Sequence, residues 1–163
     1  MRLSFKNDPL WRGYQCALGA EEGMTQINRS PKTASSSLLV MAPLHEEAFP
    51  ESSGGRVEQV PIRRLDDVFQ GATLTHDILI KLDVQGFEDR VLAGAGSVLA
   101  QARIVITEVS FERLYDDQAS FDDIYGRLCK AGFHFHGSHS QVRHPLDGRV
   151  LQEDAIFIRG DAH

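Results

Sequence analysis

One stretch near the middle of the chain constrains the fold more than any other. Residues 77–89 read D-I-L-I-K-L-D-V-Q-G-F-E-D: an apolar run ends in a polar tip at Asp83, a turn follows, and a helical pattern begins at Phe87. A continuous apolar run bounded by a turn indicates a buried strand that feeds a helix. Ligands of open α/β sheets bind beyond the carboxyl ends of such strands, so Asp83 is the first candidate for chemistry.

The second half of the chain continues this alternation of strand and helix. Its expected elements are strands at 78–82 and 103–109, helices at 87–100 and 121–131, and strands at 133–138 and 155–159. Ser120 and Asp123 form a capping-box pattern before the second helix, and Gly132 fits its stop. Gly94 and Gly96 weaken the first helix by about 1 kcal/mol each relative to alanine. The order over residues 71–163 predicts a βαβαββ core of the α/β class, mostly parallel, with a C-terminal antiparallel hairpin.

Residues 1–70 are less regular. Patterns typical of strands occur at 11–18, 24–28 and 57–62, and one helical turn is expected at 65–69. The stretches 30–37 and 42–55 are rich in serine, proline and glycine and are expected to be loops. A chain of 163 residues is long enough for one domain with a substantial core, so we expect a single domain over residues 1–163.

Composition excludes several classes of protein. A net charge of −6 argues against a nucleic-acid binder, which needs basic surface for the phosphate backbone. The two cysteines, Cys16 and Cys129, lie in apolar surroundings and lack metal-type spacing, so we expect two buried, reduced thiols. The first nine residues carry no apolar signal-peptide core, and no segment is long and apolar enough for a membrane. A cytoplasmic protein without membrane contact is the expectation.

Several motifs in order along the chain resemble one enzyme family. The run I-L-I-K-L-D-V-Q-G-F-E-D-R-V-L-A-G-A (78–95) resembles the signature of the FkbM family of S-adenosylmethionine-dependent methyltransferases. The spacing of that family is matched by further segments: A-L-G-A-E-E-G (17–23), S-S-S-L-L (35–39), V-P-I-R-R-L-D-D (60–67), I-T-E-V-S-F (106–111) and D-G-R-V-L-Q-E-D-A-I-F-I-R (147–159). The resemblance covers nearly the whole chain.

The resemblance implies a Rossmann-like, class I methyltransferase sheet of seven strands, the last antiparallel. It implies S-adenosylmethionine as the cofactor and O-methylation of a small-molecule or glycan acceptor, such as a sugar or a polyketide-type hydroxyl. The family's glycine-rich cofactor loop, D-x-G-A-N-x-G, and the acidic residue of its next strand have no counterpart here. The chain therefore matches the C-terminal two-thirds of the family, lacking the first strands, and we assign no cofactor-binding residue.

Three explanations of this departure stay open: a natural start further upstream, a fragment, or a short relative that has lost cofactor binding. Without the family's first strand, the strand at 78–82 would present an apolar edge, which is a pairing hazard. An alternative function follows, a non-catalytic interaction module that forms homo-oligomers through this edge. A phosphate-binding enzyme is a weaker alternative, because the chain has no P-loop.

Three acidic residues are candidates for catalysis around an acceptor hydroxyl. Asp83 is expected to act as a general base or a metal ligand, although an aspartate there could simply cap the next helix. Glu108 interrupts an apolar strand and needs a partner, so it either binds the acceptor or pairs with Lys81 on the neighbouring strand. Glu88 falls in the first turn of a helix, where a carboxylate also favours the helix dipole.

Two further sets are weaker candidates. Ser35, Ser36 and Ser37, together with Lys81, are expected to bind a polyol acceptor, although serine-rich loops commonly have no binding role. His134 and His136 would share a face of a strand near His139, which is a spacing that some metal sites use. These histidines lie outside the motifs of the family, so solvated side chains are the preferred interpretation. We assign no metal site; a divalent metal remains an alternative to a general base.

Overall fold

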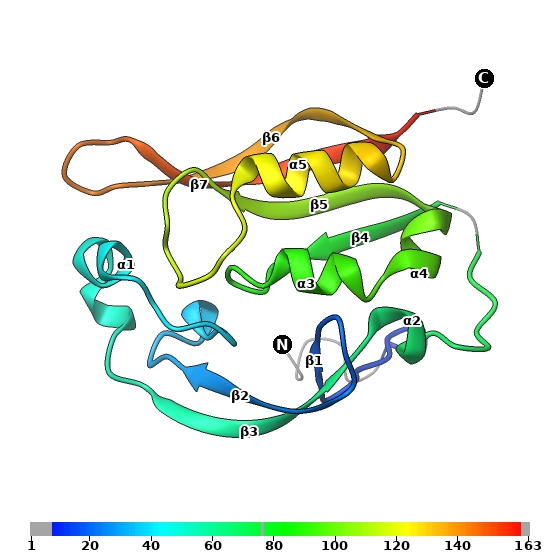
Figure 1. The fold of residues 1–163 in the computed structure, drawn as a ribbon, viewed down its shortest axis with the longest axis horizontal. Coiled ribbons are helices and arrows are strands. Elements are labelled where there is room, and N and C mark those ends of the chain that lie inside the picture. Colours follow the sequence, from blue (N-terminus) through cyan, green and yellow to red (C-terminus); the bar gives the residue numbers. More distant parts are fainter. Residues whose placement is uncertain (1–7, 76, 161–163) are drawn as a thin grey trace.

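The computed structural model describes residues 8–75 and 77–160, which form two β-sheets with short helices around them (Figure 1). Strands β1 (Ala17–Leu18), β2 (Gly23–Arg29) and β3 (Arg56–Arg63) make a three-stranded sheet in the order β1-β3-β2. Strands β4 (Ile78–Leu82), β5 (Ala102–Ser110), β6 (Phe133–Arg143) and β7 (Val150–Arg159) make a four-stranded sheet in the order β4-β5-β7-β6.

The four-stranded sheet has the expected topology. β4 and β5 are parallel, with Leu82 opposite Thr107, whereas β7 is antiparallel to both β5 and β6. The α/β class and the C-terminal antiparallel hairpin are therefore confirmed. The two strands of the hairpin extend beyond the predicted ranges, because the turn at Gly148 is tight enough for pairing to continue to Arg143 and Val150.

The described residues also form five helices: α1 (Pro43–Ala48), α2 (Leu65–Val68), α3 (Glu88–Ala93), α4 (Gly96–Gln101) and α5 (Phe121–Lys130). Two 3-10 turns, η1 (Thr33–Ser35) and η2 (Pro50–Ser52), flank α1. The predicted capping box of α5 is present, since Asp123 N donates to Ser120 Oγ and Ser120 N donates to Asp123 Oδ2. Within the described residues, no helix is long and apolar enough to cross a bilayer.

The main core lies between the four-stranded sheet and helices α3, α4 and α5. These helices bury Val91, Leu99 and Leu128 against Val105 and Phe157 of the sheet. A second, smaller cluster forms around Leu114, Tyr115 and Leu151, with Ala48 of α1 against them. The small cluster matters for function because it fixes the loop after β5.

One predicted helix was wrong: residues 87–100 form two helices, with a break at Gly94 and Ala95. The cause is a close approach from another part of the chain. A Cβ atom on Gly94 would lie 2.0 Å from the carbonyl oxygen of Gly19, and the Gly94 carbonyl accepts a hydrogen bond from Asp66 N. The Asp66 carboxylate then accepts from Ser97 N and Val98 N, which starts α4 afresh.

Two expectations for the first part of the chain were also wrong. The strand expected at 11–18 is confined to Ala17–Leu18, because only these residues pair with the end of β3. The stretch at 42–55 is not irregular throughout, since Pro43 opens helix α1 at a position that favours proline. Cys16 and Cys129 are free thiols as expected, but both are half-buried rather than buried.

Candidate active site at the ends of β4 and β5

The first candidate residues meet at the carboxyl ends of the two parallel strands. Asp83 follows β4 directly and is exposed, while Glu108 lies near the end of β5 and is half-buried. Because Leu82 lies opposite Thr107, the residues that follow each of them lie at the same edge of the sheet. The predicted proximity of Asp83 and Glu108 is therefore confirmed.

Gln85 joins these two carboxyl groups. Its side-chain Nε2 donates to Asp83 Oδ1 at 2.9 Å and to Glu108 Oε2 at 2.7 Å. Its backbone has a φ of 56°, a left-handed conformation that costs a non-glycine residue about 1–2 kcal/mol. This backbone conformation belongs to the turn that carries the Gln85 amide back over the strand ends, and strain of this kind is common at functional sites.

Tyr115 holds the Gln85 amide in place. The buried Tyr115 hydroxyl lies 3.0 Å from Gln85 Oε1, to which it donates, and 3.3 Å from the carbonyl oxygen of Ser35. Burial, followed by the nearby carboxylates of Glu108, Glu88 and Asp83, raises the pKa of Tyr115 above its ordinary value, so the phenol stays a donor. With its oxygen bound by Tyr115, the Gln85 amide must turn its NH₂ group toward the carboxyls.

The pKa of Glu108 is raised from its ordinary value of 4.5 to about 8. Burial is the largest cause, and the charges of Asp83 and Glu88 and a hydrogen bond with Asp83 add to it, while Lys81 opposes the shift. Near neutral pH this side chain therefore holds a proton beside the carboxyl of Asp83. Two adjacent carboxyl groups that share a proton are a common arrangement in acid–base chemistry.

Glu88 has a different environment. It is buried in the first turn of α3, and its Oε1 accepts a hydrogen bond from Val84 N at 3.1 Å. Burial raises the pKa of Glu88 to about 7, although backbone N–H groups of residues 84–88 partly oppose the shift. Its contacts close the turn between β4 and α3, which is a structural role.

Pairing with Lys81 was one of two alternatives for Glu108, and the structure gives Lys81 another partner. Lys81 Nζ forms an ion pair with Asp154 of β7, and Asp154 also accepts from Ser140 Oγ at 2.8 Å. Burial alone would raise the pKa of Asp154, but the bonds from Lys81 and Ser140 lower it overall.

Ser35 and Ser37 contact the cluster of Asp83, Gln85, Glu108 and Tyr115, whereas Ser36 does not. The hydroxyls of all three serines already have protein partners. Ser37 Oγ donates to the Gln85 carbonyl at 2.6 Å, Ser36 Oγ accepts from Ser30 N at 3.1 Å, and Ser35 Oγ lies 3.1 Å from Ser52 Oγ. The backbone carbonyl oxygen of Ser35 lies 3.3 Å from the Tyr115 hydroxyl oxygen. This loop therefore buttresses the cluster, and a role for the serines or for Lys81 in binding an acceptor stays a prediction.

The histidine set was not assigned to a metal, and its geometry gives no reason to change this. His136 falls where the register of β6 shifts between Phe135 and Gly137. Throughout residues 8–75 and 77–160, no group of three or more histidine, cysteine or acidic side chains could hold a metal ion.

The described residues of this edge include no open glycine-rich turn that could cradle S-adenosylmethionine. Gly86, with a φ of 91°, is the glycine of the turn after β4, and a Cβ atom there would meet side chains of Tyr115 and Gln118 at 3.2 Å. Its backbone is thus covered by protein and not open to a ligand. Nothing else in the described part of the chain forms a glycine-rich turn between a strand and a helix, so we assign no residue to the cofactor.

Two residues of the cluster escaped the sequence analysis. Gln85 stands inside the motif D-V-Q-G, between Asp83 and Glu88, and this position is the one sequence signal that could have identified it. Tyr115 carried no sequence signal, because it reaches the site only through the packing of the loop after β5 against Leu151 and Ala48.

Comparison with known proteins agrees with the motif pattern. A model of the methyltransferase FkbM domain matches residues 3–135. A 2-O-methyltransferase, NoeI, from Sinorhizobium fredii is 44% identical over 59 residues, which cover 36% of this chain and 24% of that protein. Among solved structures, magnesium protoporphyrin IX methyltransferase (ChlM) from Synechocystis with bound SAM has 19% sequence identity and a TM-score of 0.38, with 71% of this chain and 52% of that chain covered.

This chain thus spans about half of the aligned structure and about a quarter of the curated relative. The match to the family model, in contrast, covers most of the chain, including β1 to β5 and α5. It also covers Asp83, Gln85, Glu108 and Tyr115, which we call the strand-end cluster. The chain belongs to the FkbM methyltransferase domain family.

Proposed function

We propose that this chain forms the acceptor side of an S-adenosylmethionine-dependent O-methyltransferase. The observation that carries the proposal is the bridged carboxyl pair, Asp83 and Glu108, which Gln85 holds together at the edge where parallel strands end. Family membership supports methyl transfer and S-adenosylmethionine as the methyl donor. We regard residues 1–163 as one domain; this assignment and the expected cytoplasmic location stay predictions.

The chemistry that this pair can perform is removal of a proton from an acceptor hydroxyl. A hydroxyl is a poor nucleophile until it loses its proton, and a carboxylate with an ordinary pKa near 4 is a weak base for it. Raising the pKa of Glu108 to about 8 makes the pair a better match to the task. When bound, S-adenosylmethionine supplies an electrophilic methyl group; no residue of this chain is assigned to it.

Each residue then has a role. Exposed Asp83 accepts a hydrogen bond from the acceptor hydroxyl, and the carboxyl pair takes up its proton. Gln85 and Tyr115 are positioning residues, since they fix the distance and direction of the two carboxyls. Glu88 holds the turn through its bond with Val84 N, and a contact with the acceptor stays a prediction. For the acceptor we propose a hydroxyl of a sugar, glycan or polyketide-type compound, in line with the 2-O-methylation named for the relative.

The test is Asp83→Asn in the natural full-length protein. Asparagine keeps the shape and can still receive a hydrogen bond, but it cannot take a proton. We expect methyl transfer to fall by about 100-fold or more, the range of general acid–base catalysis, with binding of S-adenosylhomocysteine unchanged. Asp122→Asn, on the exposed face of α5, is the matched control. Full activity in Asp83→Asn would disprove the assignment.

A second candidate function rests on the edge of the four-stranded sheet. In the part of the chain that the structure describes, β4 has a strand neighbour on one side alone, and Leu79 is 52% exposed there. We propose as an alternative that this edge pairs with a second copy of the chain. Sedimentation of the 163-residue chain would then show a homo-oligomer that Leu79→Lys dissociates, with no binding of S-adenosylhomocysteine. A stable monomer would exclude this alternative.

A further inference from the structure

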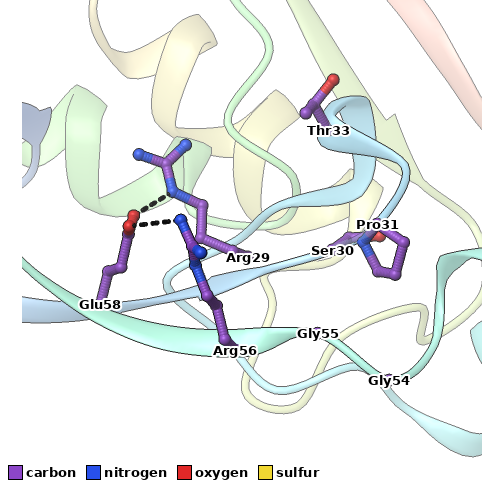
Figure 2. Close-up of a pocket in the computed structure, with 8 residues that line it drawn as sticks. All are labelled: Arg29, Ser30, Pro31, Thr33, Gly54, Gly55, Arg56 and Glu58. Carbon is purple, nitrogen blue, oxygen red and sulfur yellow. Dashed lines mark hydrogen bonds and ion pairs between the residues drawn. The ribbon is translucent and has the colours of Figure 1, made fainter.

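A hollow lies at the end of the three-stranded sheet where β2 ends and β3 begins (Figure 2). Its volume is about 490 Å³, and its wall is formed by Arg29, Ser30, Pro31, Thr33, Gly54, Gly55, Arg56 and Glu58. None of these residues belongs to the strand-end cluster. The volume falls in the range of pockets that hold small molecules, about 300–1,000 Å³.

Two arginines lie side by side in the wall of this hollow (Figure 2). Arg29 of β2 and Arg56 of β3 are direct partners in the antiparallel register, where like charges normally destabilise a sheet. Glu58 relieves part of this repulsion, because it accepts from Arg29 Nε at 2.6 Å and from Arg56 Nη2 at 3.0 Å. Hydrogen bonding from Arg29, the largest cause, lowers the pKa of Glu58, so it is ionised. One positive charge is left over in the wall of the pocket.

The remaining guanidinium nitrogens are available to a ligand. Glu58 engages Arg29 through Nε, and Figure 2 shows the two terminal nitrogens of Arg29 pointing away from that carboxylate. Glu58 thereby orients both guanidinium groups and leaves a net charge of +1. Arginine donors fixed in this manner suit the planar, two-point recognition of oxyanions.

Two glycines and a buried serine restrict the conformation of the backbone around the arginines. A Cβ atom on Gly55 would lie 1.6 Å from the carbonyl oxygen of Arg29, so only glycine permits the close approach of β3 to β2 here. Gly54 has a φ of 79°, in the region that favours glycine. The buried Ser30 hydroxyl donates to the Ser52 carbonyl at 2.7 Å and so fixes the part of the wall that Ser30 forms.

We infer that this hollow binds the tetrahedral oxyanion of a small organic ester, a phosphate or a sulfate, through Arg29 and Arg56. The local excess of positive charge stands out in a chain with a net charge of −6. The volume leaves room for the organic part of the ligand beside its anionic group. This binding site is separate from the proposed acceptor site and does not depend on methyl transfer.

The experiment is a titration of the isotopically labelled 163-residue chain, followed by nuclear magnetic resonance. Glucose 6-phosphate should shift the amide signals of Ser30, Gly54 and Gly55 in a saturable way, and glucose 6-sulfate should do so if sulfate is also accepted. Glucose itself should cause no shift. Because the attraction is between charges, added salt should weaken binding.

Variants separate a binding site from a solvated ion pair. We expect Arg29→Gln to weaken binding of glucose 6-phosphate at least tenfold, with Arg103→Gln, another exposed arginine on β5, unchanged. Arg56→Gln, whose side chain is 78% exposed, should do the same and provides a second test should Arg29→Gln fail to fold. Absence of saturable shifts, or equal affinity in Arg56→Gln and the natural chain, would overturn the inference.

Discussion

At the scale of single residues, the strand-end cluster depends on which hydrogen-bonding groups are buried together. Asp83 and Glu108 would repel each other if both were ionised, and the raised pKa of Glu108 avoids this by keeping a proton in the pair. Gln85 can donate to both carboxyls because Tyr115 occupies its oxygen. Each of the four side chains is thus constrained by another one.

The first prediction concerns the pH dependence of catalysis. Below its pKa of about 8, Glu108 is protonated and the pair is a weaker base, so kcat of the full-length protein should rise with pH through about 8. Glu108→Gln should lower kcat and abolish this rise, because glutamine does not titrate. A pH–rate profile of each protein measures this. Glu112→Gln, in the following loop, is the control, and a flat profile for the natural protein would contradict the role of Glu108.

The second prediction concerns Tyr115. Tyr115→Phe keeps the ring against His45, whose centroid lies 5.0 Å away, but leaves Gln85 Oε1 without its donor. An unsatisfied buried polar group costs about 1–3 kcal/mol, so the free energy of unfolding should fall by that amount in urea. Tyr14→Phe, which removes an exposed hydroxyl, should have no comparable effect. Equal stability of the two variants would show that Tyr115 does not hold the amide.

The sequence predicted the carboxyls of this cluster but not their partners, for a physical reason. Asp83 and Glu108 lie at the ends of apolar strands, and parallel pairing brings such ends together whatever else the chain does. The partner of Lys81 was left open by the sequence, because Asp154 comes near it only when β7 pairs with β5 in the folded chain.

At the scale of elements, the connection between α2, α3 and α4 is the least local part of the fold. Gly94 passes so close to the backbone of Gly19 that no larger residue fits, and the helix breaks there. Asp66 of α2 then provides the acceptors for the first amides of α4. One carboxylate thus links a helix after the first sheet to a helix beside the second.

The third prediction tests this link. Asp66→Ala removes the acceptor for Ser97 N at 3.0 Å and Val98 N at 3.0 Å. Loss of such a cap costs about 0.5–2 kcal/mol, so the free energy of unfolding should fall within that range. Asp66→Asn keeps one acceptor oxygen and should lose less. Asp67→Ala, the neighbouring residue of α2, serves as the control, and an equal loss in both alanine variants would mean that helix propensity rather than capping is responsible.

Elements that are specified locally were predicted well from sequence. The range of β4 agrees with its apolar run, and α5 begins and ends at its capping box and Gly132. The broken helix was missed because its cause lies in Gly19, far away along the chain, and glycine at 94 and 96 indicated only a weak helix. Helix α1 was missed because a proline-rich stretch is more often a loop than a helix start.

At the scale of the whole molecule, both sheets contribute to the candidate site. The four-stranded sheet supplies Asp83 and Glu108, while the loop after β2, through Ser35 and Ser37, supplies the contacts that cover Tyr115 and Gln85. The same loop begins at Ser30, which lies in the wall of the hollow lined by Arg29 and Arg56. Loss of packing between the two parts should therefore disturb the cluster before it disturbs the hairpin of β6 and β7.

The last prediction concerns the stability of the whole chain against pH. Glu88 and Glu108 have pKa values of about 7 and about 8 in the folded chain, above the ordinary value of 4.5 expected when unfolded. Between about pH 4.5 and about pH 8 the folded state therefore holds more of their protons than the unfolded state does. By linkage, these two groups make the free energy of unfolding fall as pH rises through that window. Urea unfolding at about pH 5 and about pH 8 should show the higher midpoint at the lower pH.

The double variant Glu88→Gln, Glu108→Gln is the control for this measurement, since glutamine binds no proton in either state. Its midpoint should change less between the two pH values than that of the natural chain. Asp154 has the opposite effect, because its pKa is lowered in the folded chain. Its contribution to stability is present above its unfolded pKa and is lost as pH falls, on the acidic side of the window. His45 also acts in the opposite direction, because burial lowers its pKa and the unfolded chain binds more of its protons as pH falls below 6.5. An equal change of midpoint in the natural chain and in the double variant would mean that the two glutamates are ionised when buried, and Glu108 would then lack its raised pKa.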